Sequence, residues 1–242
     1  MSRALPILFV LILFFSCREK KGVSESDLTI TILDIAEVNR IELGKSLRII
    51  SHCSPKIIGL DLLMPNDSLN VDTILVRELT RLKNTVKCVA VYNYNEEMNS
   101  WDSLNFSNDK FETSFEGFSN FTMTDDSVLV PELPMRQHYR DRQFFAFSYL
   151  IAENSFGVKS KFKSYTDGDF VFNIDDFGNH FKVITPTDLA SGNFKTEDFK
   201  DKIVIMGYVG NYKDTFYLDE KKRNKISGAE IQACFIRQLI NN

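Results

Sequence analysis

Two aspartates stand where apolar, strand-like runs end. Asp34 follows LTITIL, and Asp61 follows KIIGL. In open α/β sheets, ligands bind at the carboxyl ends of the strands, so adjacent strands would bring these two carboxylates together. Asp214, shortly after the apolar run KIVIMG, is a third oxygen donor that could join them. Such a set of side chains could bind Mg²⁺ or Ca²⁺.

The competing interpretation of these acids is structural. A single Asp at a strand end more often accepts hydrogen bonds from the backbone of the following turn or helix. The DxD pattern of dehalogenase-type enzymes is also absent, since Ile35 and Ala36 follow Asp34. A metal-dependent hydrolase is therefore the weaker alternative, and we expect no metal site.

Other catalytic patterns are missing from the sequence. It contains no GxSxG, and His52, His138 and His180 lie in unrelated contexts without an obvious Ser or Cys nucleophile elbow. The glycine turn at residues 207–210 lacks the Lys-Ser/Thr of a phosphate-binding loop. We therefore expect the protein not to be an enzyme and to bind no cofactor.

The composition excludes several classes of protein. The chain has 242 residues, of which 43% are hydrophobic and 26% charged, so wholesale disorder is excluded. Its formal net charge of −4, with acidic and basic residues evenly mixed, does not suit a surface that coats nucleic acid. We expect no nucleic-acid partner.

The N-terminus has the pattern of an export signal. Arg3 precedes a short apolar run at residues 4–15, followed by Ser16 and Cys17. A spanning helix needs about 20 apolar residues, whereas the core of a signal peptide needs about 7–15. Ser16-Cys17 resembles a bacterial lipobox, so we expect residues 1–16 to be a signal peptide and Cys17 to be lipidated. The alternative is a cleaved signal peptide with an incidental Cys.

The segment after Cys17 has the composition of a spacer. Residues 17–27 are polar and have no apolar period, which predicts a flexible tether between the lipid and a domain at residues 28–242. The expected location is the cell envelope, on the extracytoplasmic side of a membrane. The basic sequence REKKG differs from acidic surface-export tags, which favours the periplasmic side.

Three further cysteines, Cys53, Cys88 and Cys234, are far apart and each has apolar neighbours. An odd and scattered set predicts neither a disulfide framework nor a Cys/His metal cluster. We expect three buried thiols.

Strand-like and helix-like patterns alternate along the domain. Apolar β-branched runs predict strands, and amphipathic periods predict helices. The predicted strands cover residues 28–35, 56–63, 88–94 and 202–207, and the helices cover residues 41–51, 71–82, 144–154, 185–190 and 227–239. Strands that are apolar on both faces indicate an α/β fold with a mainly parallel central sheet and helices on both faces.

Two segments interrupt this alternation. Residues 95–121 carry phenylalanines at irregular spacing and predict a Phe-rich loop or hairpin excursion. Local packing is favoured over ligand stacking for these rings, because aromatic side chains mostly serve burial. Residues 170–173 and 180–184 predict the two strands of a second hairpin, with its turn at residues 175–179.

Taken together, residues 28–240 resemble the CHASE family, type 2, which are cyclase/histidine kinase-associated sensory extracellular domains. In that family the first strand ends in Asp, the second reads Ile-Gly-hydrophobic-Asp, and the last helix begins Gly-hydrophobic-Glu-hydrophobic-His-Ala. The matching positions here are Asp34, Gly59, Asp61, residues 202–207, Asp214, Gly228, Glu230 and Ala233. Three features depart from the pattern: Gln232 takes the usual His position, no Thr-Pro follows Asp214, and residues 40–47 replace an aromatic-proline and Arg segment, with Lys45 in place of the Arg.

The resemblance implies an extracytoplasmic sensor-like domain that binds a small ligand or a partner. The candidate ligand-binding residues are Asp34, Asp61, Asp214 and Glu230, around a cleft formed by the loops after Ile35, Leu62 and Gly207. Typical members continue into membrane helices and an intracellular output domain, so we expect this chain to pass its signal to an envelope protein partner. The alternative is a structural or interaction lipoprotein that keeps the fold without binding a ligand.

Overall fold

The computed structural model describes most of the domain. The described residues are 30–35, 38–64, 73–95, 97, 100–107, 111, 113–124, 127–156, 168–177, 181–210 and 214–241. The expected signal peptide, Cys17 and the tether lie outside them, as does His180. Within the described part, no helix has the length and apolar character needed to cross a membrane.

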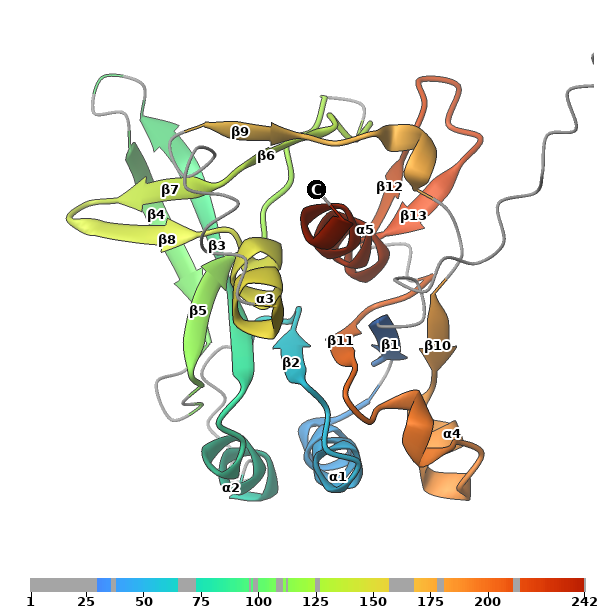
Figure 1. Ribbon diagram of the computed structural model, residues 1–242. Coiled ribbons are helices and arrows are strands. Elements are labelled where there is room, and N and C mark those ends of the chain that lie inside the picture. Colours follow the sequence, from blue (N-terminus) through green and yellow to red (C-terminus); the bar gives the residue numbers. More distant parts are fainter. Residues whose placement is uncertain are drawn as a thin grey trace, which may run out of the picture.

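A mixed, mostly parallel sheet forms the centre of the molecule (Figure 1). Its strand order is β10-β1-β11-β2-β3-β4-β7-β8, and β5 pairs with β3 as a branch. The parallel part contains β10 (Lys182–Ile184), β1 (Ile30–Asp34), β11 (Ile203–Gly207), β2 (Ile57–Leu60), β3 (Thr85–Asn95) and β5 (Phe115–Phe118). The α/β fold class and the mainly parallel sheet predicted above are confirmed.

The second half of the sheet comes from the Phe-rich segment and from residues 136–145 beyond it. β4 (Ser100–Phe106) pairs antiparallel with β3, and β7 (Arg136–Tyr139) pairs antiparallel with β8 (Arg142–Phe145). The predicted excursion is therefore built largely as strands that extend the central sheet. Lys87, buried on β3, forms an ion pair with Glu116 on β5 at 2.8 Å and helps to join these two strands.

Helices cover both faces of the sheet, as predicted. In Figure 1, α1 (Arg40–His52), α2 (Thr73–Arg81) and α4 (Pro186–Ser191) lie below it, and α3 (Phe147–Phe156) and α5 (Gly228–Asn241) lie above. Successive side chains of a strand point to opposite faces. Ile32 accordingly packs in the core shared with α3 and α5, whereas Leu33 packs in the core shared with α1 and α2.

Two small antiparallel pairs complete the described structure. They are β6 (Glu132–Pro134) with β9 (Asp169–Val171), and β12 (Thr215–Tyr217) with β13 (Lys225–Ser227).

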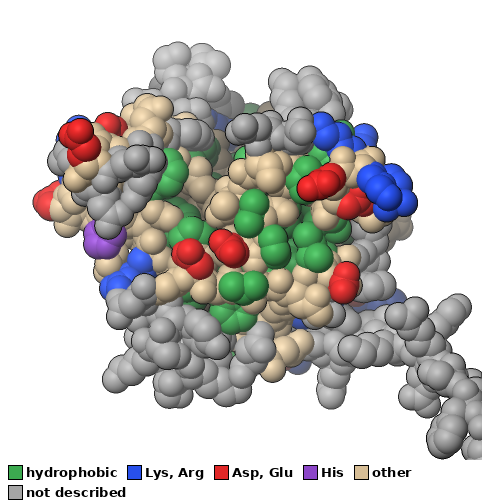
Figure 2. Space-filling model, turned by 90° about the horizontal axis from the view of Figure 1, so that it is seen from above, with side chains coloured by type: hydrophobic (Ala, Val, Ile, Leu, Met, Phe, Trp, Pro, Cys, Tyr) green, Lys and Arg blue, Asp and Glu red, His purple; other side chains and the backbone are tan. Residues whose placement is uncertain are grey.

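Figure 2 shows the face of the molecule that is seen from above. Hydrophobic and acidic side chains lie together in the middle of this face, and Lys and Arg side chains lie toward its edges.

The predicted hairpin at residues 170–184 is wrong. β9 pairs with β6, and β10 instead pairs in parallel with β1 at the sheet edge. The reason is burial: Ile184 lies in the core beneath α1 and α4, which a solvent-exposed hairpin would leave uncovered. The helix predicted at residues 144–154 begins at Phe147, because Phe144 and Phe145 belong to β8.

The three cysteines of the described part match the prediction. Cys53, Cys88 and Cys234 are buried and form no disulfide.

Candidate functional site

The strand order brings Asp34 and Asp61 to one edge of the sheet. Asp34 ends β1 opposite Gly207, and the backbone N–H of Asp61 donates to the carbonyl oxygen of Met206 at 2.8 Å. β11 therefore separates the two aspartates and contributes only a glycine between them. This agrees with the expectation that the carboxyl ends of parallel strands gather their polar residues.

The N-terminus of α5 lies against the same edge. Asp214 accepts a hydrogen bond from the backbone N–H of Gly228, the first residue of α5. A Cβ atom at Gly228 would lie 2.6 and 2.7 Å from the two carboxylate oxygens of Asp214, so only glycine permits this approach. A carboxylate at this position also interacts favourably with the helix dipole.

Glu230 caps the same helix. Its Oε2 accepts hydrogen bonds from the backbone N–H and the hydroxyl of Ser227, at 2.9 and 2.7 Å. The backbone N–H of Glu230 donates back to the Ser227 hydroxyl at 3.3 Å. This reciprocal arrangement is a capping box, which satisfies N–H groups that have no partner within the helix.

Asp34 fixes a loop in a similar way. Its Oδ1 accepts a hydrogen bond from the backbone N–H of Val209, in the glycine turn after β11, at 3.1 Å. Three of the four candidate acids, Asp34, Asp214 and Glu230, thus bind backbone N–H groups. Their participation in ligand binding stays a prediction.

Asp61 differs from the other three. Its carboxyl group accepts no hydrogen bond from any residue that the structure describes, although its side chain is only partly exposed. Burial, followed by the nearby charge of Asp214, raises the pKa of Asp61 from 3.8 to about 8. Burial also raises the pKa of Asp214, against the effect of its hydrogen bond from Gly228. Asp61 is therefore mostly uncharged at neutral pH.

Gln232, the residue in the family's usual His position, borders this region. Its Nε2 donates to the carbonyl oxygen of Ser119 at 3.3 Å, while its Oε1 is buried and has no partner among the described residues. The neighbouring Cys88 thiol has its pKa raised by burial and then by Asp61. Such a buried thiol is unreactive, because the thiolate is the nucleophilic form.

The structure gives no support to a metal centre here. Across the described residues, no three His, Cys, Asp or Glu side chains converge closely enough to hold an ion. Asp34, Asp61 and Asp214 share an edge without forming such a group.

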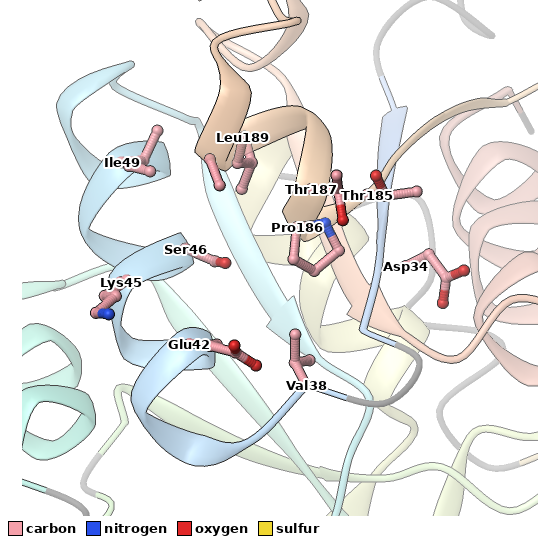
Figure 3. A pocket seen from close by; sticks show the side chains of 11 residues that line it. Asp34, Val38, Glu42, Lys45, Ser46, Ile49, Thr185, Pro186, Thr187 and Leu189 are labelled. Atoms are coloured by element: carbon pink, nitrogen blue, oxygen red, sulfur yellow. The ribbon is translucent and has the colours of Figure 1, made fainter.

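A cavity of about 680 Å³ lies on the other side of β1, between α1 and α4 (Figure 3). From α1 it is lined by Glu42, Lys45, Ser46 and Ile49, which are spaced as one stripe of a helix. Val38 and Asp34 border one end, and residues 185–187 and 189–190 form the α4 wall. Small-molecule pockets have volumes of about 300–1,000 Å³, so this cavity can hold a small ligand.

This cavity was not predicted from the sequence. The predicted cleft lay by the loops after Ile35, Leu62 and Gly207, and of the four candidate acids only Asp34 borders the cavity. The available signal was the stripe of polar residues on α1, which includes Lys45.

Comparison with known proteins identifies a family. A family model described as the CHASE2 domain matches residues 22–242. Neither the curated proteins nor the solved structures contain a match to this chain.

Proposed function

Because the chain belongs to the CHASE2 domain family, an extracellular sensory domain family, we propose that it is an extracytoplasmic sensor-like module that binds a small ligand between α1 and α4. This family is sensory rather than catalytic, so a binding role is favoured over an enzymatic one. The place of the ligand and the means of attachment go beyond the family assignment.

The observation that carries the proposal is the cavity at the carboxyl end of β1. It combines an apolar wall with a few polar groups, which is the usual composition of a small-molecule site. Helices from two distant parts of the chain form its walls, since α1 follows β1 and α4 follows β10. A ligand in this position would contact both helices and stabilise their packing.

The proposed attachment is a lipid on Cys17. The support is the sequence: a short apolar run followed by Ser16-Cys17 and then a polar spacer. Each buried methylene of an acyl chain contributes about 0.8 kcal/mol, so several chains hold a protein at a membrane almost permanently. An envelope protein that receives the signal stays a prediction.

Thermal unfolding of the full-length chain in detergent tests the binding role. Fractionated metabolite pools are added one at a time, with Mg²⁺ and Ca²⁺ as separate arms. A ligand stabilises the folded state by RT ln(1 + [L]/Kd), so a bound metabolite raises the melting temperature. The matched variant is Ala190→Trp, which fills the cavity and should remove the shift.

Two results would contradict the proposal. If no pool shifts the melting temperature, the structural or interaction lipoprotein becomes the better interpretation, in keeping with the three acids that bind backbone N–H groups. If a shift is seen with Ala190→Trp as with the natural chain, the ligand binds elsewhere.

A further inference from the structure

The polar side chains that line the α1–α4 cavity differ in whether they already form hydrogen bonds within the protein. The hydroxyl of Thr185 donates to Asp188 at 2.6 Å and accepts from the Asp188 N–H at 3.1 Å, so it is occupied by the capping box of α4. Asp34 binds Val209, and its side chain alternates with Leu33, which faces α1. In Figure 3 the carboxylate of Asp34 accordingly points away from α1 and α4.

Three groups on α1 remain available to a ligand. Glu42 uses Oε2 to accept the Asn39 N–H at 3.2 Å in the capping box of α1, which leaves Oε1. The Lys45 ammonium has no ion-pair partner among the described residues. Ser46 is only 4% exposed, yet its hydroxyl forms no hydrogen bond with any described residue.

The Ser46 hydroxyl is the most informative of these. A serine inside a helix commonly donates to a carbonyl oxygen one turn earlier, as Thr80 and Ser155 do here. Ser46 does not, and it borders the cavity. Ser46 Oγ is not among the fully buried unpartnered atoms of the described residues, which are Thr85 Oγ1, Ser148 Oγ and Gln232 Oε1, so it keeps some exposure and is accessible to a molecule in the cavity.

Glu42 and Lys45 show the charge pattern of that molecule. Opposite charges three residues apart on a helix are neighbours and often pair. These two do not pair. Figure 3 shows the Glu42 carboxylate and the Ser46 hydroxyl directed toward the space between α1 and α4, whereas Lys45 lies on the side of α1 turned away from α4, so its long side chain must turn to reach a ligand there. A ligand with one positive and one negative group would satisfy both.

The apolar part of the lining indicates the chemistry of the uncharged part of the ligand. Val38 and Ile49 are only partly buried hydrophobic residues, packed beside the buried Leu189. They form an aliphatic wall next to the charged stripe. Among the described residues that line the cavity there is no aromatic side chain, so recognition of a planar ring has no support there.

We propose that the α1–α4 cavity binds a zwitterion with an aliphatic side chain, a free α-amino acid or a short peptide. The ligand ammonium binds Glu42, the ligand carboxylate binds Lys45 and Ser46, and the aliphatic group packs on Val38, Ile49 and Leu189. This inference rests on the proposed binding function and assigns its ligand class.

Three probes with the same aliphatic body separate the charges. L-norvaline carries both, pentanoate lacks the ammonium group, and butylamine lacks the carboxylate. Isothermal titration of the full-length chain in detergent should show L-norvaline binding at least tenfold more tightly than either analogue. A dipeptide of norvaline serves as a fourth arm that separates a free amino acid from a peptide.

Variants on α1 complete the test. Lys45→Gln should lower the affinity for L-norvaline at least tenfold. Glu42→Gln, which keeps a capping side chain, should lower this affinity similarly. Arg48→Gln is the matched control, because it removes an exposed charge from the same helix without touching the cavity, and it should bind normally.

Each contrary result has a distinct meaning. If pentanoate or butylamine binds as tightly as L-norvaline, the site recognises a simple anion or cation, and the inference is overturned. It is also overturned if Lys45→Gln and Arg48→Gln behave alike. If all four probes fail while a metabolite pool still shifts the melting temperature of the natural chain and not of Ala190→Trp, the ligand class is wrong and the binding function stands. If the pools fail too, both are wrong.

Discussion

The Cβ atom of Ala229 lies 2.8 Å from the position that a Cβ atom on Gly207 would occupy. The first turn of α5 therefore rests directly on the backbone of β11, at the edge where Asp34 ends β1 and Asp61 follows β2. The Cβ atom of Asp61 lies 3.3 Å from the same position. The absence of a side chain at residue 207 thus determines how closely the helix approaches the strand ends.

Gly207→Ala should destabilise the protein by about 1–3 kcal/mol, because the added methyl group must displace Ala229 in a packed core. Urea unfolding followed by circular dichroism measures the change. Gly168→Ala is the control, since nothing lies within 4 Å of a Cβ atom there. The double variant Gly207→Ala with Ala229→Gly should regain part of the loss. Equal stability of the two single glycine variants would refute the close contact.

The capping box of α5 gives a second prediction. Ser227→Ala should cost about 0.5–2 kcal/mol of stability, because it leaves N–H groups of a buried helix end without partners. Glu230→Ala should have a similar effect, and the two losses should not add, since each change already breaks the shared hydrogen bonds. Glu220→Ala in the exposed turn after β12 is the control. Strictly additive losses in urea unfolding would show that the two side chains act separately.

Asp61 predicts an unusual dependence of stability on pH. Its pKa is raised from 3.8 to about 8 in the folded state, so between about pH 4 and pH 8 the folded chain holds a proton that the unfolded chain has lost. The contribution of Asp61 to the free energy of unfolding therefore falls as pH rises across that range, by up to about 1.4 kcal/mol per pH unit. Asp61→Asn removes the titration and should be more stable than the natural chain at pH 8.5.

Thermal melts from pH 4.5 to pH 9 measure this difference. The gap between Asp61→Asn and the natural chain should widen as pH rises and level off above about pH 8. Asp102→Asn changes an exposed carboxylate on β4 and should follow the natural curve. Parallel curves for Asp61→Asn and the natural chain would show that Asp61 titrates normally.

Lipid attachment gives the fourth prediction. Cys17→Ser should move the protein from the membrane fraction to the soluble fraction of cells, because it removes the only proposed acylation site. Ser26→Ala, in the same polar segment, should remain with the membrane. Mass spectrometry of the natural chain should find acyl groups on Cys17. An unmodified Cys17 in a soluble protein would rule out the anchor.

The sequence predicted the sheet core and its helices well, because strands buried on both faces must be apolar throughout. The runs ending at Asp34, Asp61 and Gly207 are all strands, and their carboxyl ends meet as expected. The glycine of the family's Ile-Gly-hydrophobic-Asp pattern also has a physical role. A Cβ atom on Gly59 would lie 2.5 Å from Ile151 and 2.8 Å from Phe147, so these two side chains of α3 would have to shift if residue 59 were larger.

Pairing between short strands that are distant in the sequence was not predictable in the same way. β9 and β10 are three residues each, and their partners are chosen by the tertiary structure rather than by local pattern. The site was only partly predictable for a similar reason. Residue type indicated four acids, but only the fold shows that three of them bind backbone N–H groups and that Asp61 does not.

The position of β1 has a consequence for how the protein reaches its native state. This first strand lies inside the sheet and pairs on both sides with strands from near the end of the chain, β10 and β11. Contacts of such long sequence separation form slowly, because the intervening chain must be ordered first. The N-terminal strand must therefore stay unpaired until β10 and β11 are in place, which leaves an apolar segment uncovered during folding.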